Sequence, residues 1–140
     1  MKKILSFVLC LLMIFIFSGC NENNLVLSTY ERTEETRVTL LVVEDSITPE
    51  EVALEITNKT NAFLNHNSSM YFLEQKIDGE WYRIIQDGVD LLNNMYMYPK
   101  FTATQPIRFE KALKKGRYRI VKEFVSEGNR FFADAEFEIK

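Results

Sequence analysis

The last ten residues of the chain alternate between an apolar set and a mainly polar set. The apolar set is Phe131, Ala133, Ala135, Phe137 and Ile139, and charged residues together with Phe132 occupy the positions between them. A period of two places the two sets on opposite faces of a β-strand, with one face buried. The pattern therefore predicts a strand at the end of the chain and excludes an amphipathic helix there.

Shorter segments of the same character precede this one. We expect strands over residues 38–43, 52–57, 69–77, 80–85, 106–112 and 118–125, separated by turn-forming residues. Asp78-Gly79 between two of these runs is a hairpin signal, because glycine tolerates the positive φ of a type I′ turn. Residues 86–105 are irregular. The sequence thus predicts an all-β fold, an antiparallel sandwich of about seven strands.

The first twenty residues have the composition of an export signal. Lys2 and Lys3 precede an apolar run from Ile4 to Phe17, and small residues follow it. That run has fourteen residues, whereas a membrane-spanning helix needs about 20. A permanent transmembrane anchor is therefore the weaker interpretation.

The residues Phe17-Ser18-Gly19-Cys20 resemble the lipobox of bacterial lipoproteins, with Phe17 where that motif most often has leucine. The resemblance implies that a diacylglycerol is attached to the Cys20 sulfur and that the signal is cut between Gly19 and Cys20. The mature protein would then be held on the extracytoplasmic face of the cell membrane by this lipid. An ordinary signal peptide with a late cysteine is the alternative.

Removal of residues 1–19 takes away two lysines and leaves 15 basic against 20 acidic residues, a net charge of −5. An acidic chain without a basic stripe argues against nucleic-acid binding. Cys20 would be the only remaining cysteine, which excludes a disulfide, a cysteine nucleophile and a cysteine-ligated zinc site. We expect a polar lipidated tether over residues 20–35 and one folded domain over residues 36–140.

The stretch from Leu113 to Tyr118 resembles the tyrosine corner of immunoglobulin-like sandwiches, in which a Leu and a Gly precede the Tyr. The residues that carry this likeness are Leu113, Gly116 and Tyr118. More broadly, residues 36–140 look like a bacterial immunoglobulin-like domain, on Ile56-Thr57-Asn58-Lys59-Thr60, Asp78-Gly79-Glu80-Trp81, Gly116-Arg117-Tyr118-Arg119-Ile120-Val121-Lys122 and Ala135-Glu136-Phe137. Such domains are usually spacers or interaction modules, so the resemblance implies no enzymatic activity.

No catalytic motif, metal-ligand spacing or cofactor fingerprint is found in the sequence. His66 is the only histidine, and Asn65-His66-Asn67-Ser68 predicts a solvated loop. The carboxylates of residues 34, 35, 44, 45, 50 and 51 lack calcium-loop spacing and are expected to be solvated.

The irregular segment holds Leu91, Leu92, Met95, Tyr96, Met97, Tyr98 and Phe101, of which Met95 to Tyr98 are the candidate binding residues. Methionine and aromatic side chains on a long loop suit an adaptable binding surface. The more ordinary alternative is that this loop folds over one open end of the sandwich and extends the core.

The leading hypothesis from the sequence is a non-enzymatic, membrane-tethered binding or accessory module with an envelope protein as partner. A second hypothesis is an envelope enzyme or sensor acting on cell-wall carbohydrate, with a carboxylate pair and an aromatic platform such as Trp81 or Tyr82. A third is a domain that only stiffens or protects the extracellular region of a partner.

Overall fold

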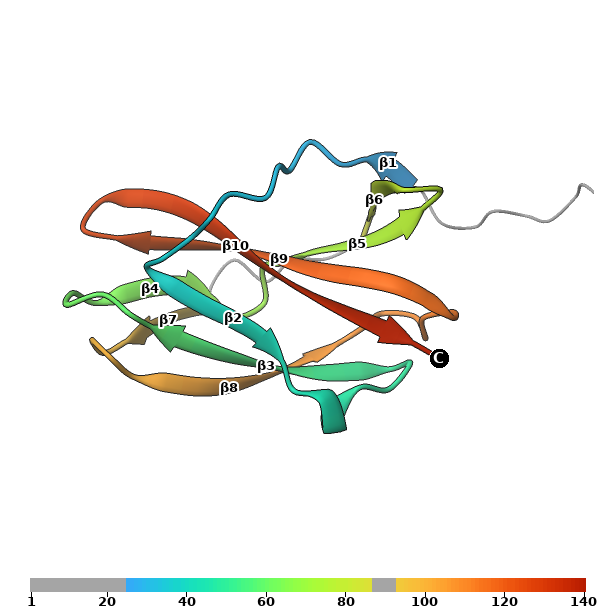
Figure 1. Ribbon diagram of the computed structural model, residues 1–140. Coiled ribbons are helices and arrows are strands. Elements are labelled where there is room, and N and C mark those ends of the chain that lie inside the picture. The colour runs from blue at the N-terminus through green and yellow to red at the C-terminus, as the bar shows by residue number, and fades with distance from the viewer. Residues whose placement is uncertain (1–24, 87–92) are drawn as a thin grey trace, which may run out of the picture.

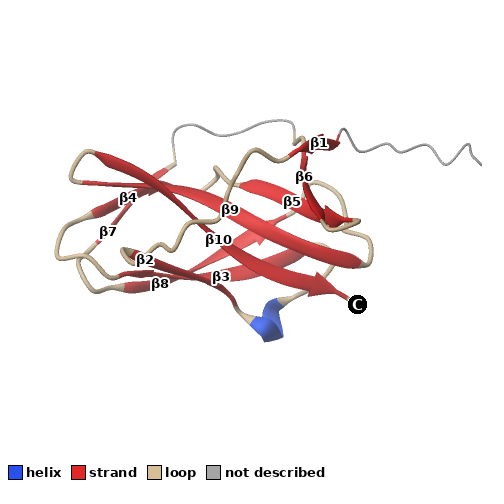
Figure 2. Cartoon of the chain, turned by 45° about the horizontal axis from the view of Figure 1, so that its top comes forward, coloured by secondary structure: helices blue, strands red, loops and turns tan. Residues whose placement is uncertain are grey.

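The computed structural model describes residues 25–86 and 93–140, which form two antiparallel β-sheets that face one another (Figures 1 and 2). The larger sheet contains β1 (Leu25–Leu27), β4 (Leu64–Asn67), β5 (Phe72–Ile77), β6 (Glu80–Ile84), β7 (Asn94–Met97), β9 (Gly116–Ser126) and β10 (Asn129–Ile139). The smaller sheet contains β2 (Val38–Val42), β3 (Glu51–Asn58) and β8 (Thr102–Arg108). A short 3-10 helix, η2 (Glu44–Ser46), joins β2 to β3. The all-β antiparallel fold predicted from the sequence is confirmed.

The described residues form ten strands, whereas the sequence predicted about seven. The additional strands β1, β4 and β7 have three or four residues each, which is too short to show a period of two. Residues 106–112 were expected as one strand, but β8 runs from Thr102 to Arg108. Pro106 lies within this strand because β8 is at the edge of its sheet, where a missing N–H is tolerated.

The core lies between the two sheets. The alternating apolar residues of β10 are buried, as their period predicted, and they belong to one core cluster with the inner residues of β9 and β3. Phe137 stacks on Tyr118 with ring centroids 5.6 Å apart, and Phe131 stacks on Phe124 at 5.9 Å. Each fully buried side chain of this size stabilises the fold by roughly 1.5–3 kcal/mol.

One edge of β9 pairs with β10 along its whole length. The opposite edge pairs first with β5, up to Val121, and then with β4 at Val125. Lys122 lies where β9 changes partner, with its side chain fully buried. Its amino group donates hydrogen bonds to the carbonyl oxygens of Asn67 at 2.9 Å and Met70 at 3.0 Å. The amino group of Lys122 thus provides a hydrogen-bond donor to two carbonyl oxygens at the point where the ladder of β9 is interrupted.

Residues 25–37, named here the N-terminal strap, run from β1 across the outer face of the larger sheet to β2 (Figures 1 and 2). The Ser28 hydroxyl donates to Glu74 at 2.6 Å, and the Tyr30 hydroxyl donates to Asp134 at 3.0 Å. Arg32 pairs with Asp134 as well. From residue 25 onward, the segment expected as a tether is therefore in contact with the domain.

Candidate functional site

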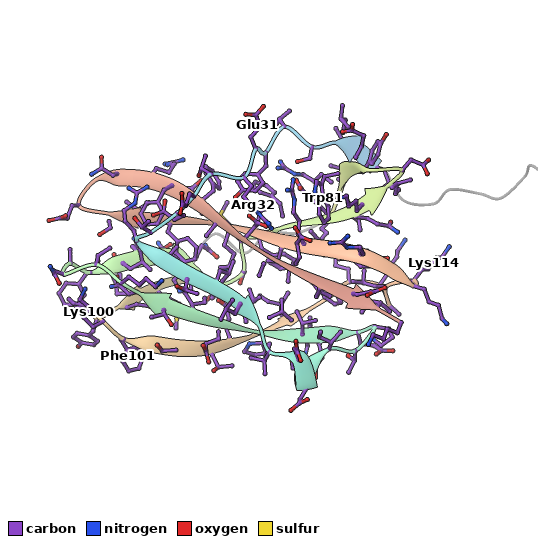
Figure 3. All side chains as sticks on the ribbon, viewed as in Figure 1. Glu31, Arg32, Trp81, Lys100, Phe101 and Lys114 are labelled. Atoms are coloured by element: carbon purple, nitrogen blue, oxygen red, sulfur yellow. The ribbon has the colours of Figure 1, made fainter. Side chains whose placement is uncertain are left out.

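Four large aromatic side chains are exposed at one end of the molecule, and we name them the aromatic surface. They are Phe63, Tyr96, Tyr98 and Phe101, with exposed fractions of 54%, 67%, 66% and 52%. The rings of Phe63 and Tyr98 lie 5.2 Å apart, and the backbone N–H of Phe101 donates to the carbonyl oxygen of Tyr98 at 3.2 Å. Figure 3 shows Phe101 and its neighbour Lys100 at the end opposite to Lys114.

The register of β4 and β7 explains why these side chains point outward. Leu64 pairs with Met97, and both are buried in the core. Because side chains alternate along a strand, Tyr96 on β7 and Tyr98 just beyond its end take the opposite, outer side. The prediction for Met97 as part of a binding surface is therefore wrong, since only 3% of it is exposed. Met95 lies on the inner side of β7 but at its margin, where it remains half-exposed.

Asn58, at the end of β3, holds the two loops of the aromatic surface together. Its side chain is fully buried, and its amide nitrogen donates to the carbonyl oxygens of Ala62 at 2.9 Å and Tyr98 at 3.0 Å. Its amide oxygen accepts hydrogen bonds from the N–H of Thr60 at 2.9 Å and from the Thr60 hydroxyl at 2.8 Å. The loops 59–63 and 98–101 are thereby fixed to one buried group, which orients their aromatic rings before any partner binds.

Sequence reasoning missed Phe63 and Asn58 as parts of this site. The turn-forming residues from Asn58 to Asn61 were the available signal, because asparagine in such a run commonly bonds to nearby backbone. Nothing in the sequence indicated that this loop meets the loop at residues 98–101, which is far away along the chain.

His66 lies in β4 and not in a solvated loop, so that prediction is wrong. His66 is buried, with 6% of its surface exposed, and its ring centroid lies 5.5 Å from that of Phe124. Burial, together with the positive charge of Lys122, lowers the pKa of His66 to about 4. Burial also lowers the pKa of Lys122 to about 8. Both groups face the core, so they are not accessible to a ligand.

A second polar cluster lies beneath the N-terminal strap. Glu74 is fully buried and accepts a hydrogen bond from Arg119 at 2.7 Å, while Arg83 approaches it at 3.3 Å. The guanidinium of Arg119 lies 4.4 Å from the ring centre of Trp81. Burial, and secondarily the charge of Asp134, raises the pKa of Tyr30 to about 12. The cluster fastens the strap to the sheet, and one face of the proposed carbohydrate platform Trp81 is occupied by Arg119.

A half-open hollow of about 650 Å³ lies beside η2. Glu44, Asp45, Glu136 and Glu138 contribute to its lining. Glu136 is paired with both Arg32 and Arg117. Within residues 25–86 and 93–140, no three histidine, cysteine or acidic side chains are arranged to hold a metal ion.

Tyr118 has the geometry of a tyrosine corner. Its side chain is buried, and its hydroxyl donates to the carbonyl oxygen of Lys114 at 2.8 Å. Leu113 packs against the core. A Cβ at Gly116 would lie 3.3 Å from Nε2 of Gln75 and 3.6 Å from the Tyr118 ring, and φ there is +154°. A side chain here would strain the backbone and press on Gln75, whereas the Tyr118 ring lies at an ordinary contact distance.

The predicted lipidation residue Cys20 and its neighbour Gly19 lie outside the described residues. In the part of the chain that is described, no helix has the length and apolar character required to cross a membrane.

A two-sheet antiparallel fold with a tyrosine corner defines an immunoglobulin-like domain. The family model for the bacterial Ig-like domain matches residues 34–138. The chain therefore belongs to the bacterial Ig-like domain family, as its resemblance predicted. A search of the curated proteins found no match.

Proposed function

We propose that this protein is a lipid-anchored, non-catalytic module on the extracytoplasmic face of the cell membrane, which binds an envelope protein through the aromatic surface. The observation that carries the proposal is the set of four exposed aromatic residues, three of which lie on loops that are fixed by the buried Asn58. Aromatic side chains are enriched at protein interfaces, where they bury much area at a small cost in conformational entropy.

The position of Leu25, the first described residue, supports an orientation in which the aromatic surface points away from the membrane. β1 lies at the end of the molecule opposite to the loops of the aromatic surface (Figure 1). Four residues separate Cys20 from Leu25, so Leu25 would lie within roughly 20 Å of the lipid-bearing sulfur. With a lipid on Cys20, the end that carries β1 is held near the membrane. The aromatic surface then points away from it, toward other components of the envelope.

The bacterial Ig-like family agrees with a surface-associated accessory module. The aromatic platform of the carbohydrate-active alternative is already engaged in another contact, since Arg119 covers one face of Trp81. The proposal therefore assigns recognition, and not chemistry, to the domain.

The test compares the doubly substituted variant Tyr98→Ala/Phe101→Ala with Leu41→Ala. Leu41 is a matched control, because it is a large apolar residue of β2 that is 52% exposed away from the aromatic surface. Each protein is expressed in the source bacterium, crosslinked on intact cells and purified, and the partners that copurify are quantified by mass spectrometry.

Aromatic residues at the centre of an interface commonly contribute 2 kcal/mol or more each. We therefore expect the recovery of a specific partner to fall at least tenfold in the doubly substituted variant and to be unchanged in Leu41→Ala. Equal recovery in both variants would show that the aromatic surface does not bind the partner.

A further inference from the structure

The strand β7 has one backbone edge without a partner in the described part of the chain. The N–H of Ser68 donates to the carbonyl oxygen of Asn93 at 2.8 Å, which makes this a hydrogen-bonded pair of the β4–β7 ladder. Such pairs alternate with non-bonded pairs along an antiparallel ladder. Asn94 and Tyr96 therefore direct their N–H and C=O groups away from β4. The pairing of Asn65 with β9 and the bond from Lys122 to the Asn67 carbonyl agree with this alternation.

The other edges of the two sheets are protected. β2 and β10 lie against each other (Figures 1 and 2). β8 carries Pro106, which has no N–H, and the charged Arg108. β1 has only three residues. Natural proteins commonly use proline, charge, covering segments or short length to block pairing at sheet edges. β7 carries neither proline nor charge.

The charge pattern indicates which chain can approach this edge. The mature chain would have a net charge of −5, so two copies repel each other over most of their surfaces. No acidic residue occurs from Asn93 to Phe109, and Asn94 to Tyr98 are all uncharged. A two-fold contact places the same surface of both copies together. Electrostatic repulsion between two copies therefore opposes such a contact least at an uncharged edge such as β7.

We propose that β7 pairs with β7 of a second copy of this chain, so that the two larger sheets form one continuous sheet. The hydrogen bonds would come from the outward backbone groups of Asn94 and Tyr96. Because pairing uses the edge, Tyr96 and Tyr98 remain on the outer face and the dimer carries two adjacent aromatic surfaces. This inference does not depend on the lipid at Cys20.

The test uses the chain from Asn21 to Lys140, which lacks the signal and the lipidation residue and retains every described residue. Sedimentation velocity at rising concentration measures dimer formation by the unmodified chain and by Asn94→Pro and Asn94→Ala. The proline removes one outward N–H without removing a bond to β4, and the alanine keeps that N–H. We expect the unmodified chain and Asn94→Ala to dimerise equally, and Asn94→Pro to dimerise at least tenfold more weakly.

A second variant leaves the backbone intact, so it decides the question even if the proline prevents folding. Tyr96→Lys places two positive charges near the two-fold axis, where like charges on neighbouring strands are destabilising. We expect this variant to be monomeric with an unchanged circular dichroism spectrum. A monomeric unmodified chain at all concentrations, or a Tyr96→Lys dimer as stable as that of the unmodified chain, would overturn the proposal.

Discussion

Replacement of the buried Asn58 tests whether one side chain organises the aromatic surface. Asn58→Ala removes three hydrogen bonds to the carbonyl oxygens of Ala62, Met97 and Tyr98 and two from Thr60. Each such bond contributes about 1 kcal/mol net, and a buried backbone group left unpaired costs about 1–3 kcal/mol. Water can reach part of the loops and recover some of this loss. We therefore expect a destabilisation of about 3 kcal/mol, roughly a 150-fold change in the unfolding equilibrium.

Urea unfolding followed by the fluorescence of Trp81, the only tryptophan, measures this change. The midpoint should move down by roughly 1–2 M with an unchanged slope. Asn61→Ala is the control, because Asn61 is exposed in the same loop and should change stability by less than about 0.5 kcal/mol. Amide exchange in residues 59–63 and 98–101 should accelerate only in the Asn58 variant. A loss below about 1 kcal/mol with unchanged exchange would refute the role of Asn58.

Three further predictions concern the buried polar groups. Folded His66 stays neutral down to about pH 4, whereas an unfolded histidine binds a proton near pH 6.5. Stability should therefore fall as the pH is lowered through this interval, by about 3 kcal/mol in all. Urea titrations of His66→Gln should lack this component, and an unchanged pH profile would contradict the assignment. Glu74→Ala leaves Arg119 buried without its carboxylate and should cost about 3–5 kcal/mol in calorimetry, so a near-neutral effect would show that water solvates the site. Tyr118→Phe removes one hydroxyl bond and should cost about 1 kcal/mol, while no loss would mean that this bond adds nothing to the corner.

The sequence was sufficient to predict strands and turns that are marked by a local pattern of residues. The alternation from Phe131 to Ile139 predicted the buried face of β10, and Asp78-Gly79 predicted the hairpin between β5 and β6. Asp78 and Gly79 both have positive φ, as a type I′ turn requires. These features are local, because a turn and a period depend on residues close together in the chain.

The sequence was insufficient where burial depends on distant neighbours. Leu64-Asn65-His66-Asn67 is polar at three of its four positions, yet it forms β4 because β9 and β7 supply partners on both edges. Lys122 is buried because a change of strand partner places two carbonyl oxygens near its amino group.

The candidate site could be predicted only in part for the same reason. Tyr96 and Tyr98 were identified by their residue types, but Met97 was assigned to the surface because the strand that turns it inward was not predicted. Phe63 joins the site through a loop contact with Tyr98, which no local pattern encodes. The tyrosine corner could be predicted because its residues are close together in the sequence.

The central claim is that Cys20 carries the lipid that holds this Ig-like domain at the membrane. Mass spectrometry of the mature protein from membranes tests it most directly, in a comparison of the unmodified chain with Cys20→Ala. The account predicts a mature chain that begins at a diacylglycerol-modified Cys20, and loss of both the modification and membrane retention in the variant. An unmodified amino terminus downstream of Cys20, or an uncleaved chain in the membrane, would contradict it.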